Sequence, residues 1–322
     1  MRTLLFTYYR AVAPLALLLL SGCGGGGGAG SAALPDSAKT ALTSTRKTST
    51  TDEAPNGPTT TTLLVPDSGA VVPADTPAAG AAASPSGGKL VVRLPTTPPT
   101  DQNHRLAYQF AATLLPGFAE NINAELSLPR DVVLTMSDSE ELNAYYSADT
   151  HSITLNYGLI LYAVTQVHEG TARGGDSGGD GAAQSAAGMM LFVLYHELGH
   201  CLIHECDLPV PGREEDDADQ VATLFMTSNP TPTTGPMLAG AALFFAHLAE
   251  TDAANIAWDD AHSIGQQRTY NILGWLYGSD PARMRGLVDN QVLSAERAQG
   301  GIEEYRRIKR AWANYLKPYS KS

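Results

Sequence analysis

The sequence predicts a mostly helical α+β domain with a small β-sheet over residues 89–322, preceded by a disordered tether. The β-prone runs are short and confined to residues 89–158, whereas several long segments show apolar residues at helical spacing. Residues 23–88 are rich in Gly, Ala, Ser, Thr and Pro and hold few large apolar side chains, so burial cannot offset their chain entropy. The folded domain is therefore expected to begin near residue 89.

Residues 1–22 have the features of a lipoprotein signal peptide. Arg2 and Arg10 give it a positive start, and the apolar stretch 11–20 is too short to span a membrane. This stretch ends in Leu-Ser-Gly-Cys, which resembles a bacterial lipobox with Cys23 as the lipidated residue. The resemblance implies a protein held by acyl chains in the bacterial cell envelope, with the outer membrane or the periplasmic face favoured. The alternative is a plain secretory signal with an incidental cysteine.

The composition of the 322-residue chain limits its partners and its redox chemistry. Its formal net charge is −12, and the charge pattern is not the basic one of a nucleic-acid-binding domain. Once Cys23 is lipidated, Cys201 and Cys206 are the remaining cysteines. A disulfide between them stays open, because their five-residue spacing is awkward unless a helix ends near His204.

The first part of the domain is expected to supply the sheet. We predict strands at residues 89–95 and 131–138 and a β-hairpin at 143–158. Residues 103–126 show helical periodicity, and Pro116 with Gly117 is expected to kink or divide this helix.

The second part is expected to be helical. We predict helices at residues 159–168, 188–203, 213–227 and 237–250 and in the C-terminal segment. The Gly-, Asp- and Ser-rich insert 169–188 lacks the nonapeptide period of a calcium-binding repeat and is expected to be a solvated loop. The C-terminal segment has an apolar stripe at helical spacing that should pack in the core: Ile302, Tyr305, Ile308, Trp312 and Leu316.

The apolar helix near residue 196 is interrupted by the polar sequence His-Glu-Leu-Gly-His. His196 and His200 are four residues apart on a helix, so both imidazoles point the same way and can reach one Zn²⁺ at about 2.0–2.1 Å. Glu197 stands beside them, where it can take a proton from water. The flanking residues are apolar nearly all round and must be buried, and a buried ionisable trio is costly unless it is paired or binds a metal. The motif therefore predicts a zinc site.

A catalytic zinc site needs a third protein ligand and keeps one position for water. Ile203 and Cys206 occupy the positions where the metzincin pattern requires Gly and His, which excludes that subclass. His204 is one turn too far along a straight helix to share the metal with both other histidines. The remaining candidates lie in the acidic segment that follows: Glu214, Glu215, Asp216, Asp217 and Asp219.

Helical phase separates the roles of these acids. Ala218, Ala222 and Phe225 lie on the apolar face of the predicted helix, and Glu215 and Asp219 share that face. Glu214 lies near the edge of the face and stays open as an alternative, as does Asp216 on the flank.

Glu215 and Asp219, together with the HExxH sequence, resemble the Glu-x-x-x-Asp helix of the gluzincins, the thermolysin-like zinc peptidases. This resemblance implies that Glu215 is the third ligand and that Asp219 binds the outer nitrogen of His196. More specifically, residues 143–281 resemble a bacterial family whose metallopeptidase activity is itself inferred. The segments that match it are "NAYY", "ITLNYGL", "HELGHCLI", "DLPVPGREEDDADQVA" and "HSIGQQRTYNILGWLYGSDP".

Gluzincins also use a downstream histidine and a tyrosine to stabilise the oxyanion, a role that preorganised donors fill in general. His262 is the corresponding candidate for a catalytic residue here, and Arg268 lies in the same segment.

These observations predict a zinc-dependent peptide hydrolase anchored to a bacterial membrane, with water activated by Zn²⁺ and Glu197 and with a peptide or protein as substrate. The alternative is a non-catalytic zinc-binding envelope lipoprotein, in which a fourth ligand such as Cys206 or His204 takes the place of water. No specificity module is recognisable in the sequence.

Overall fold

The computed structural model describes residues 86–210, 212–228, 230, 234–251 and 265–321. The predicted signal peptide, Cys23 and His262 lie outside these residues, as does nearly all of the predicted tether.

The described residues form an α+β fold that is mostly helical and contains a four-stranded sheet, as the sequence predicts. The strands are β1 (Leu90–Val92), β2 (Val132–Ser137), β3 (Ala144–Ser147) and β4 (Ser152–Asn156). Their order across the sheet is β1-β2-β4-β3, with β1, β2 and β4 parallel and β3 antiparallel to β4. The predicted hairpin thus puts β3 at one edge of the sheet.

Helix α3 (Gln102–Glu125) is continuous, so of the expected kink or division at Pro116 the division is wrong. Asp101 caps its first turn by accepting hydrogen bonds from the backbone N–H groups of residues 103 and 104. Pro116 is exposed, and the residues on the opposite side of the helix, including Leu115 and Phe118, are fully buried. Packing of this face therefore keeps the helix intact across the proline.

Helix α4 (Tyr157–Glu205) is 49 residues long and runs through the insert 169–188, so the prediction of a solvated loop there is wrong. The glycines of the insert have low helix propensity, which costs about 1 kcal/mol each, and packing of described residues on both sides of the insert opposes that cost. At the end of the insert, a Cβ on Gly188 would lie 2.0 Å from the carbonyl oxygen of Met237. A small residue is needed there because the next helix approaches the backbone of α4 directly.

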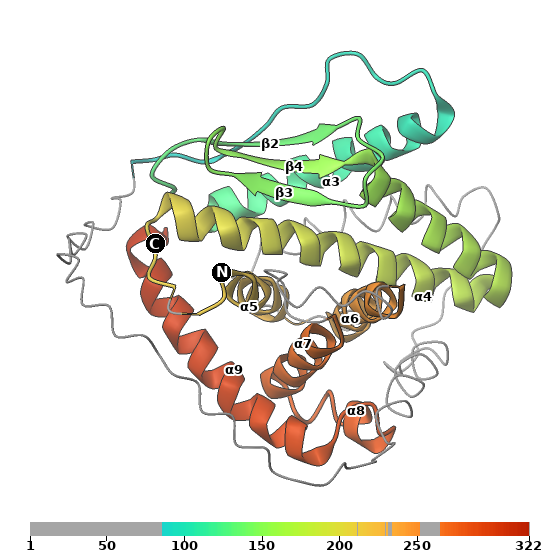
Figure 1. Ribbon diagram of the computed structural model, residues 1–322, viewed down its shortest axis with the longest axis vertical. Helices are drawn as coiled ribbons and strands as arrows, with labels where there is room; N and C mark the ends of the chain where they lie inside the picture. The colour runs from blue at the N-terminus through green and yellow to red at the C-terminus, as the bar shows by residue number, and fades with distance from the viewer. Residues whose placement is uncertain (1–85, 211, 229, 231–233, 252–264, 322) are drawn as a thin grey trace, which may run out of the picture.

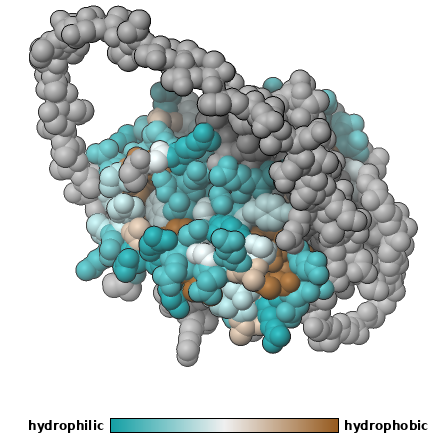
Figure 2. Space-filling model, turned by 60° about the horizontal axis from the view of Figure 1, so that its bottom comes forward, coloured by the Kyte–Doolittle hydropathy of each residue, from teal (hydrophilic) through white to brown (hydrophobic). Residues whose placement is uncertain are grey.

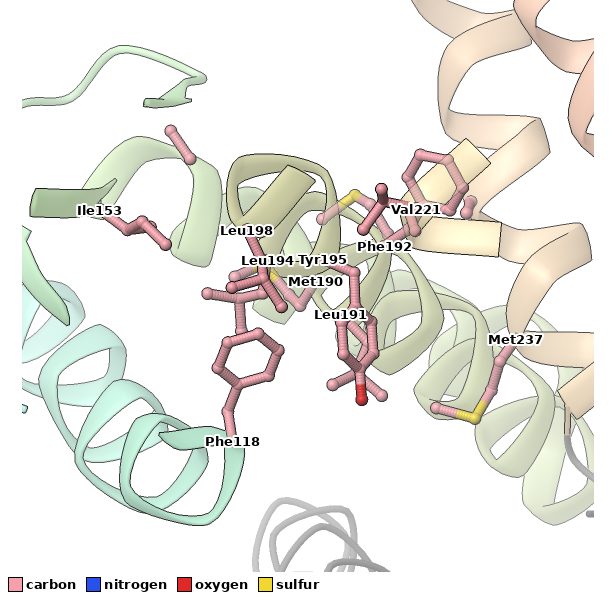
Figure 3. Packing of buried hydrophobic residues seen from close by; sticks show 14 of the residues in the cluster. Phe118, Ile153, Met190, Leu191, Phe192, Leu194, Tyr195, Leu198, Val221 and Met237 are labelled. Carbon is pink, nitrogen blue, oxygen red and sulfur yellow. The ribbon is translucent and has the colours of Figure 1, made fainter. Parts of the chain in front are cut away.

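The C-terminal half of α4 lies at the centre of the molecule. The sheet and α3 cover one side of it, and α5 (Glu214–Ser228), α6 (Thr234–Thr251) and α7 (Gly265–Ser279) lie on the other (Figure 1). Figure 3 shows Phe118 and Ile153 on one side of Leu194 and Leu198, with Val221 and Met237 on the other.

One described segment, Gln184–Glu205 within α4, is long and apolar enough to cross a membrane. Its most apolar window is 83% buried inside the protein, which identifies it as a core helix.

The C-terminal elements close the fold. Helix α8 (Gly286–Asp289) precedes α9 (Ala295–Leu316), which packs on α7, with Tyr305 and Trp312 of the predicted stripe buried. The surface seen in Figure 2 is mainly hydrophilic with scattered apolar patches.

The turn η1 (Lys317–Tyr319) follows α9, and the chain around it contacts the C-terminal ends of α4 and α3. The Tyr319 hydroxyl donates to the carbonyl of Cys206, and the N–H of Lys321 donates to the carbonyl of Glu125. Cys201 and Cys206 are both buried free thiols, so the disulfide that the spacing left open does not form in this structure.

Candidate metal centre

His196, His200 and Glu215 converge on one point between α4 and α5. The two histidine Nε2 atoms are 3.2 Å apart. Glu215 Oε2 lies 3.1 Å from Nε2 of His196 and 3.5 Å from Nε2 of His200. Among the described residues, these three form the group that can hold a metal ion.

The close approach of α5 to α4 depends on Gly199, the fourth residue of the motif. A Cβ at this position would lie 2.8 Å from Cα of Ala218 in α5. Ala218 stands three residues after Glu215 and one before Asp219, so contact at this glycine brings both acids to the histidines. Gly199 thus sets the distance between α4 and α5.

The outer nitrogen of His196 is held by a buried ion pair. Its Nδ1 lies 2.8 Å from Oδ1 of Asp219, whose carboxylate accepts hydrogen bonds from Nε and Nη2 of Arg268, both at 2.7 Å. Burial alone would raise the pKa of Asp219, but Arg268 and His196 outweigh it and lower this pKa below its usual range. Arg268 therefore supports Asp219 behind His196, and it is not placed as an oxyanion donor.

The outer nitrogen of His200 is held differently. Its Nδ1 lies 2.6 Å from Oε1 of Glu214, and the same oxygen is 3.0 Å from Nε2 of His204. Burial alone would lower the pKa of His200, but the hydrogen bonds to Glu215 and Glu214 raise this pKa to about 9. A metal ion that binds here has to displace that proton.

Glu197 is only 6% exposed, and its Oε2 accepts a 2.8 Å hydrogen bond from the backbone N–H of Tyr146 in β3. Burial raises the pKa of this carboxyl, while the two neighbouring histidines act in the opposite direction. A carboxylate with a raised pKa is a better proton acceptor than an ordinary one, which suits a general base.

The three converging atoms fit a tetrahedral metal ion. Ligands about 2.0–2.1 Å from one zinc ion in a tetrahedron lie about 3.4 Å from one another. The separations here are 3.1, 3.2 and 3.5 Å. In addition, each histidine has a carboxylate at its Nδ1, which favours a proton there and leaves the Nε2 lone pair for a metal.

Several of these contacts were not expected from the sequence. Glu214, an alternative ligand in the sequence, contacts the outer nitrogen of His200 instead. The hydrogen bond from Tyr146 to Glu197 joins residues 51 positions apart, so no local pattern indicates it. Cys206 and His204 are absent from the metal-capable group that the described residues contain.

Comparison with known proteins adds one finding. A family model with the description "Putative metallopeptidase" matches residues 96–316, which covers more than half of the chain. No curated protein and no solved structure matches the chain at a significant level.

Proposed function

The chain belongs to this metallopeptidase family, and from that premise we propose that it is a zinc-dependent peptide hydrolase. The observation that supports the proposal is the convergence of His196, His200 and Glu215 beside Glu197. A metal-ligating trio next to a buried carboxylate is the arrangement that hydrolysis by an activated water requires.

Zinc is the metal that this ligand set favours. Two imidazole nitrogens and one carboxylate oxygen in near-tetrahedral geometry suit Zn²⁺, whereas Mg²⁺ and Ca²⁺ prefer all-oxygen sites. A site with three protein ligands keeps a position open, as in catalytic zinc sites. The two residues of the alternative do not close it: His204 Nε2 binds Glu214, and neither His204 nor Cys206 belongs to the metal-capable group of the described residues.

When bound, the zinc ion would lower the pKa of water and polarise the scissile carbonyl. Glu197 then accepts a proton from the attacking water and passes it to the leaving amine. Its Oε2 is held by the N–H of Tyr146, which fixes the orientation of the carboxylate during both transfers. Asp219 and Glu214 hold the two histidine rings in place.

The anchoring of the enzyme in the bacterial cell envelope is part of the proposal and rests on the lipobox-like sequence at Cys23. Labelling cells with a radioactive fatty acid should label the wild-type protein, and Cys23→Ala should lose both the label and membrane fractionation. Unchanged labelling of the variant would refute lipidation at this residue.

The decisive test of activity is Glu197→Gln, which keeps the shape of the side chain and removes its basicity. The variant should bind one zinc per chain and lose peptide hydrolysis by about 10²–10⁴-fold, the usual contribution of a general base. The control is Glu120→Gln on the exposed side of α3, which should cleave a peptide library like the wild type. Full turnover by Glu197→Gln would refute the mechanism, and zinc binding without any wild-type cleavage would favour the non-catalytic alternative.

The ligand assignment is tested on the acidic segment by metal analysis. Glu215→Ala should abolish tight zinc binding, because it removes one of three ligands. Asp217→Ala should leave zinc stoichiometry unchanged, since Asp217 is not among the three converging residues. Tight binding by Glu215→Ala would show that another acid is the ligand.

A further inference from the structure

Glu205, the last residue of α4, is a buried acid that the proposed reaction does not use. It is 4% exposed and is surrounded by donors from the side of the sheet. Its Oε2 lies 3.0 Å from Nε of Arg130, and its Oε1 lies 2.7 Å from Nδ1 of His151. The Tyr146 hydroxyl donates to the same Oε1 at 2.6 Å. We call these four residues the Glu205 cluster.

Burying a carboxylate is costly unless it is fully hydrogen-bonded. We therefore expect the Glu205 cluster to have a structural or functional role. Three separate segments meet in it: Arg130 precedes β2, Tyr146 lies in β3, and His151 lies in the β3–β4 turn. His151 adopts a left-handed backbone conformation with φ 49°, which is uncommon for a residue other than glycine. Such a conformation persists where its surroundings fix it, and here the ring reaches Glu205.

Tyr146 connects the Glu205 cluster to the general base. Its hydroxyl binds Glu205, and its backbone N–H binds Glu197, eight residues earlier in the same helix. Eight residues of α-helix span about 12 Å, so one tyrosine bridges more than two turns of α4. Its ring also stacks on His204, with centroids 5.8 Å apart.

The register of the hairpin explains why this N–H faces Glu197. Asn156 donates its N–H to the carbonyl of Asn143, which makes this pair a hydrogen-bonded one. Because such pairs alternate along an antiparallel ladder, Tyr146 opposite Ile153 is a pair without mutual hydrogen bonds. Its N–H therefore points away from β4, toward α4. A shift of β3 along α4 would move this donor away from Glu197.

We propose that Glu205 is a positioning residue for Glu197 and that it acts through Tyr146. The Glu205 cluster fixes the β3–β4 hairpin against the end of α4, and the hairpin then holds one oxygen of Glu197 through the N–H of Tyr146. The other oxygen of Glu197 is left to exchange protons with water and the leaving amine. This inference rests on the proposed function, since it assigns a positioning role within that reaction.

The test uses Tyr146→Phe in the full, zinc-loaded chain, because this change removes the hydroxyl and keeps the backbone N–H. Misplacement of a catalytic group by about 1 Å can cost up to about 10²-fold in rate, so a loosened hairpin should lower kcat about tenfold. KM and zinc stoichiometry should stay within twofold, because the variant removes neither a ligand nor a group at the metal. The matched control is Tyr277→Phe, a half-buried tyrosine of α7.

A second readout does not depend on catalysis. Hydrogen exchange of the β3 amides, followed by mass spectrometry, should become about tenfold faster in Tyr146→Phe and stay unchanged in Tyr277→Phe. Glu205→Gln retains an oxygen that accepts the hydroxyl and should keep most of the turnover, whereas Glu205→Ala also removes the contacts to Arg130 and His151 and should lose at least as much kcat as Tyr146→Phe. The double variant Tyr146→Phe/Glu205→Ala should lose no more kcat than Glu205→Ala alone, because the hydroxyl has already lost its acceptor in that variant.

Unchanged exchange and unchanged kcat in Tyr146→Phe would overturn the inference. A lower melting temperature with normal kcat per bound zinc would overturn it as well, because that result describes a purely structural contact. If Glu205→Ala does not fold, the kcat and the hydrogen exchange of Tyr146→Phe decide whether the inference holds. Failure of the proposed function is seen separately, as a wild-type protein whose peptide cleavage does not depend on Glu197.

Discussion

The two histidines of the motif lie one helical turn apart, yet their outer nitrogens have very different surroundings. His196 contacts Asp219, which is paired with Arg268, and the side chains of this acid and this arginine are 3% and 10% exposed. His200 contacts Glu214, which is paired with His204, and these two side chains are 34% and 47% exposed. We call the first pair the buried support and the second the open support.

The difference indicates that α5 holds the two histidine rings with unequal strength. A buried carboxylate bound through two hydrogen bonds to arginine is strongly held, and removing one partner leaves an uncompensated charge in the interior. An exposed pair contributes little, because water and salt screen it. We therefore expect the buried support to fix the position of the metal and the open support to adjust the second ring.

The largest expected effect comes from Asp219→Asn, which breaks the buried support. Loss of a carboxylate that orients a ligating histidine lowers metal affinity about 10–100-fold. The buried Arg268 also loses its counter-charge, so the free energy of unfolding should fall by about 3–5 kcal/mol. Competition with a zinc chelator and urea unfolding measure the two quantities. Wild-type zinc affinity would contradict the role assigned to Asp219.

Gly199→Ala should have the next largest effect, because it acts on both supports together. The added Cβ meets the backbone of Ala218 at 2.8 Å and forces α5 away from α4. Overpacking of this kind costs about 1–3 kcal/mol in the free energy of unfolding, and zinc affinity should fall with it. Gly212→Ala is the control, since a Cβ there meets nothing within 4 Å. Equal zinc affinities in the two variants would show that helix spacing does not determine the site.

A smaller effect is expected for Glu214→Gln, which breaks the open support. A partly exposed pair contributes about 0.2–1 kcal/mol, so zinc affinity should fall less than about fivefold. Raising the salt concentration should reduce the difference between this variant and the wild type, because exposed charges are screened. The same chelator competition measures it. A loss as large as that of Asp219→Asn would show that the two supports are equivalent.

The comparison also shows which parts of the site can be predicted from the sequence. His196, Glu197 and His200 form a local motif, and helical phase is sufficient to select Glu215 and Asp219 for the side of α5 that faces α4. Local geometry cannot select Arg268 as the partner of Asp219, because the two lie 49 residues apart and meet only in the folded chain.

The fold shows the same division between local and long-range effects. The short strands and the hairpin follow from β-propensity and turn residues, and the structure confirms them. The insert 169–188 is helical although its glycines favour a loop, because the helix is fixed by packing at both ends, at Leu159 and Ile160 and again at Gly188. Composition reports the propensity of a segment and not the contacts that override it.

The two support variants should differ least in how their free energy of unfolding depends on alkaline pH. The groups that titrate there belong to neither support. Burial raises the pKa of Cys206 to about 12, and it raises the pKa of Tyr319 to about 12 as well. The unfolded chain releases these protons near pH 8.5 and 10, so their contribution to stability is complete below about pH 8.5 and is lost as the pH rises toward 12.

Above about pH 10 each group lowers the free energy of unfolding by up to about 1.4 kcal/mol per pH unit. Because neither group belongs to a support, zinc-loaded Asp219→Asn and Glu214→Gln should lose stability in parallel between about pH 10 and 12. Tyr319→Phe should reduce this slope in either background. Urea unfolding at several pH values measures the curves, and curves that diverge between the two variants would place the alkaline transition in the metal site instead of at the end of α4.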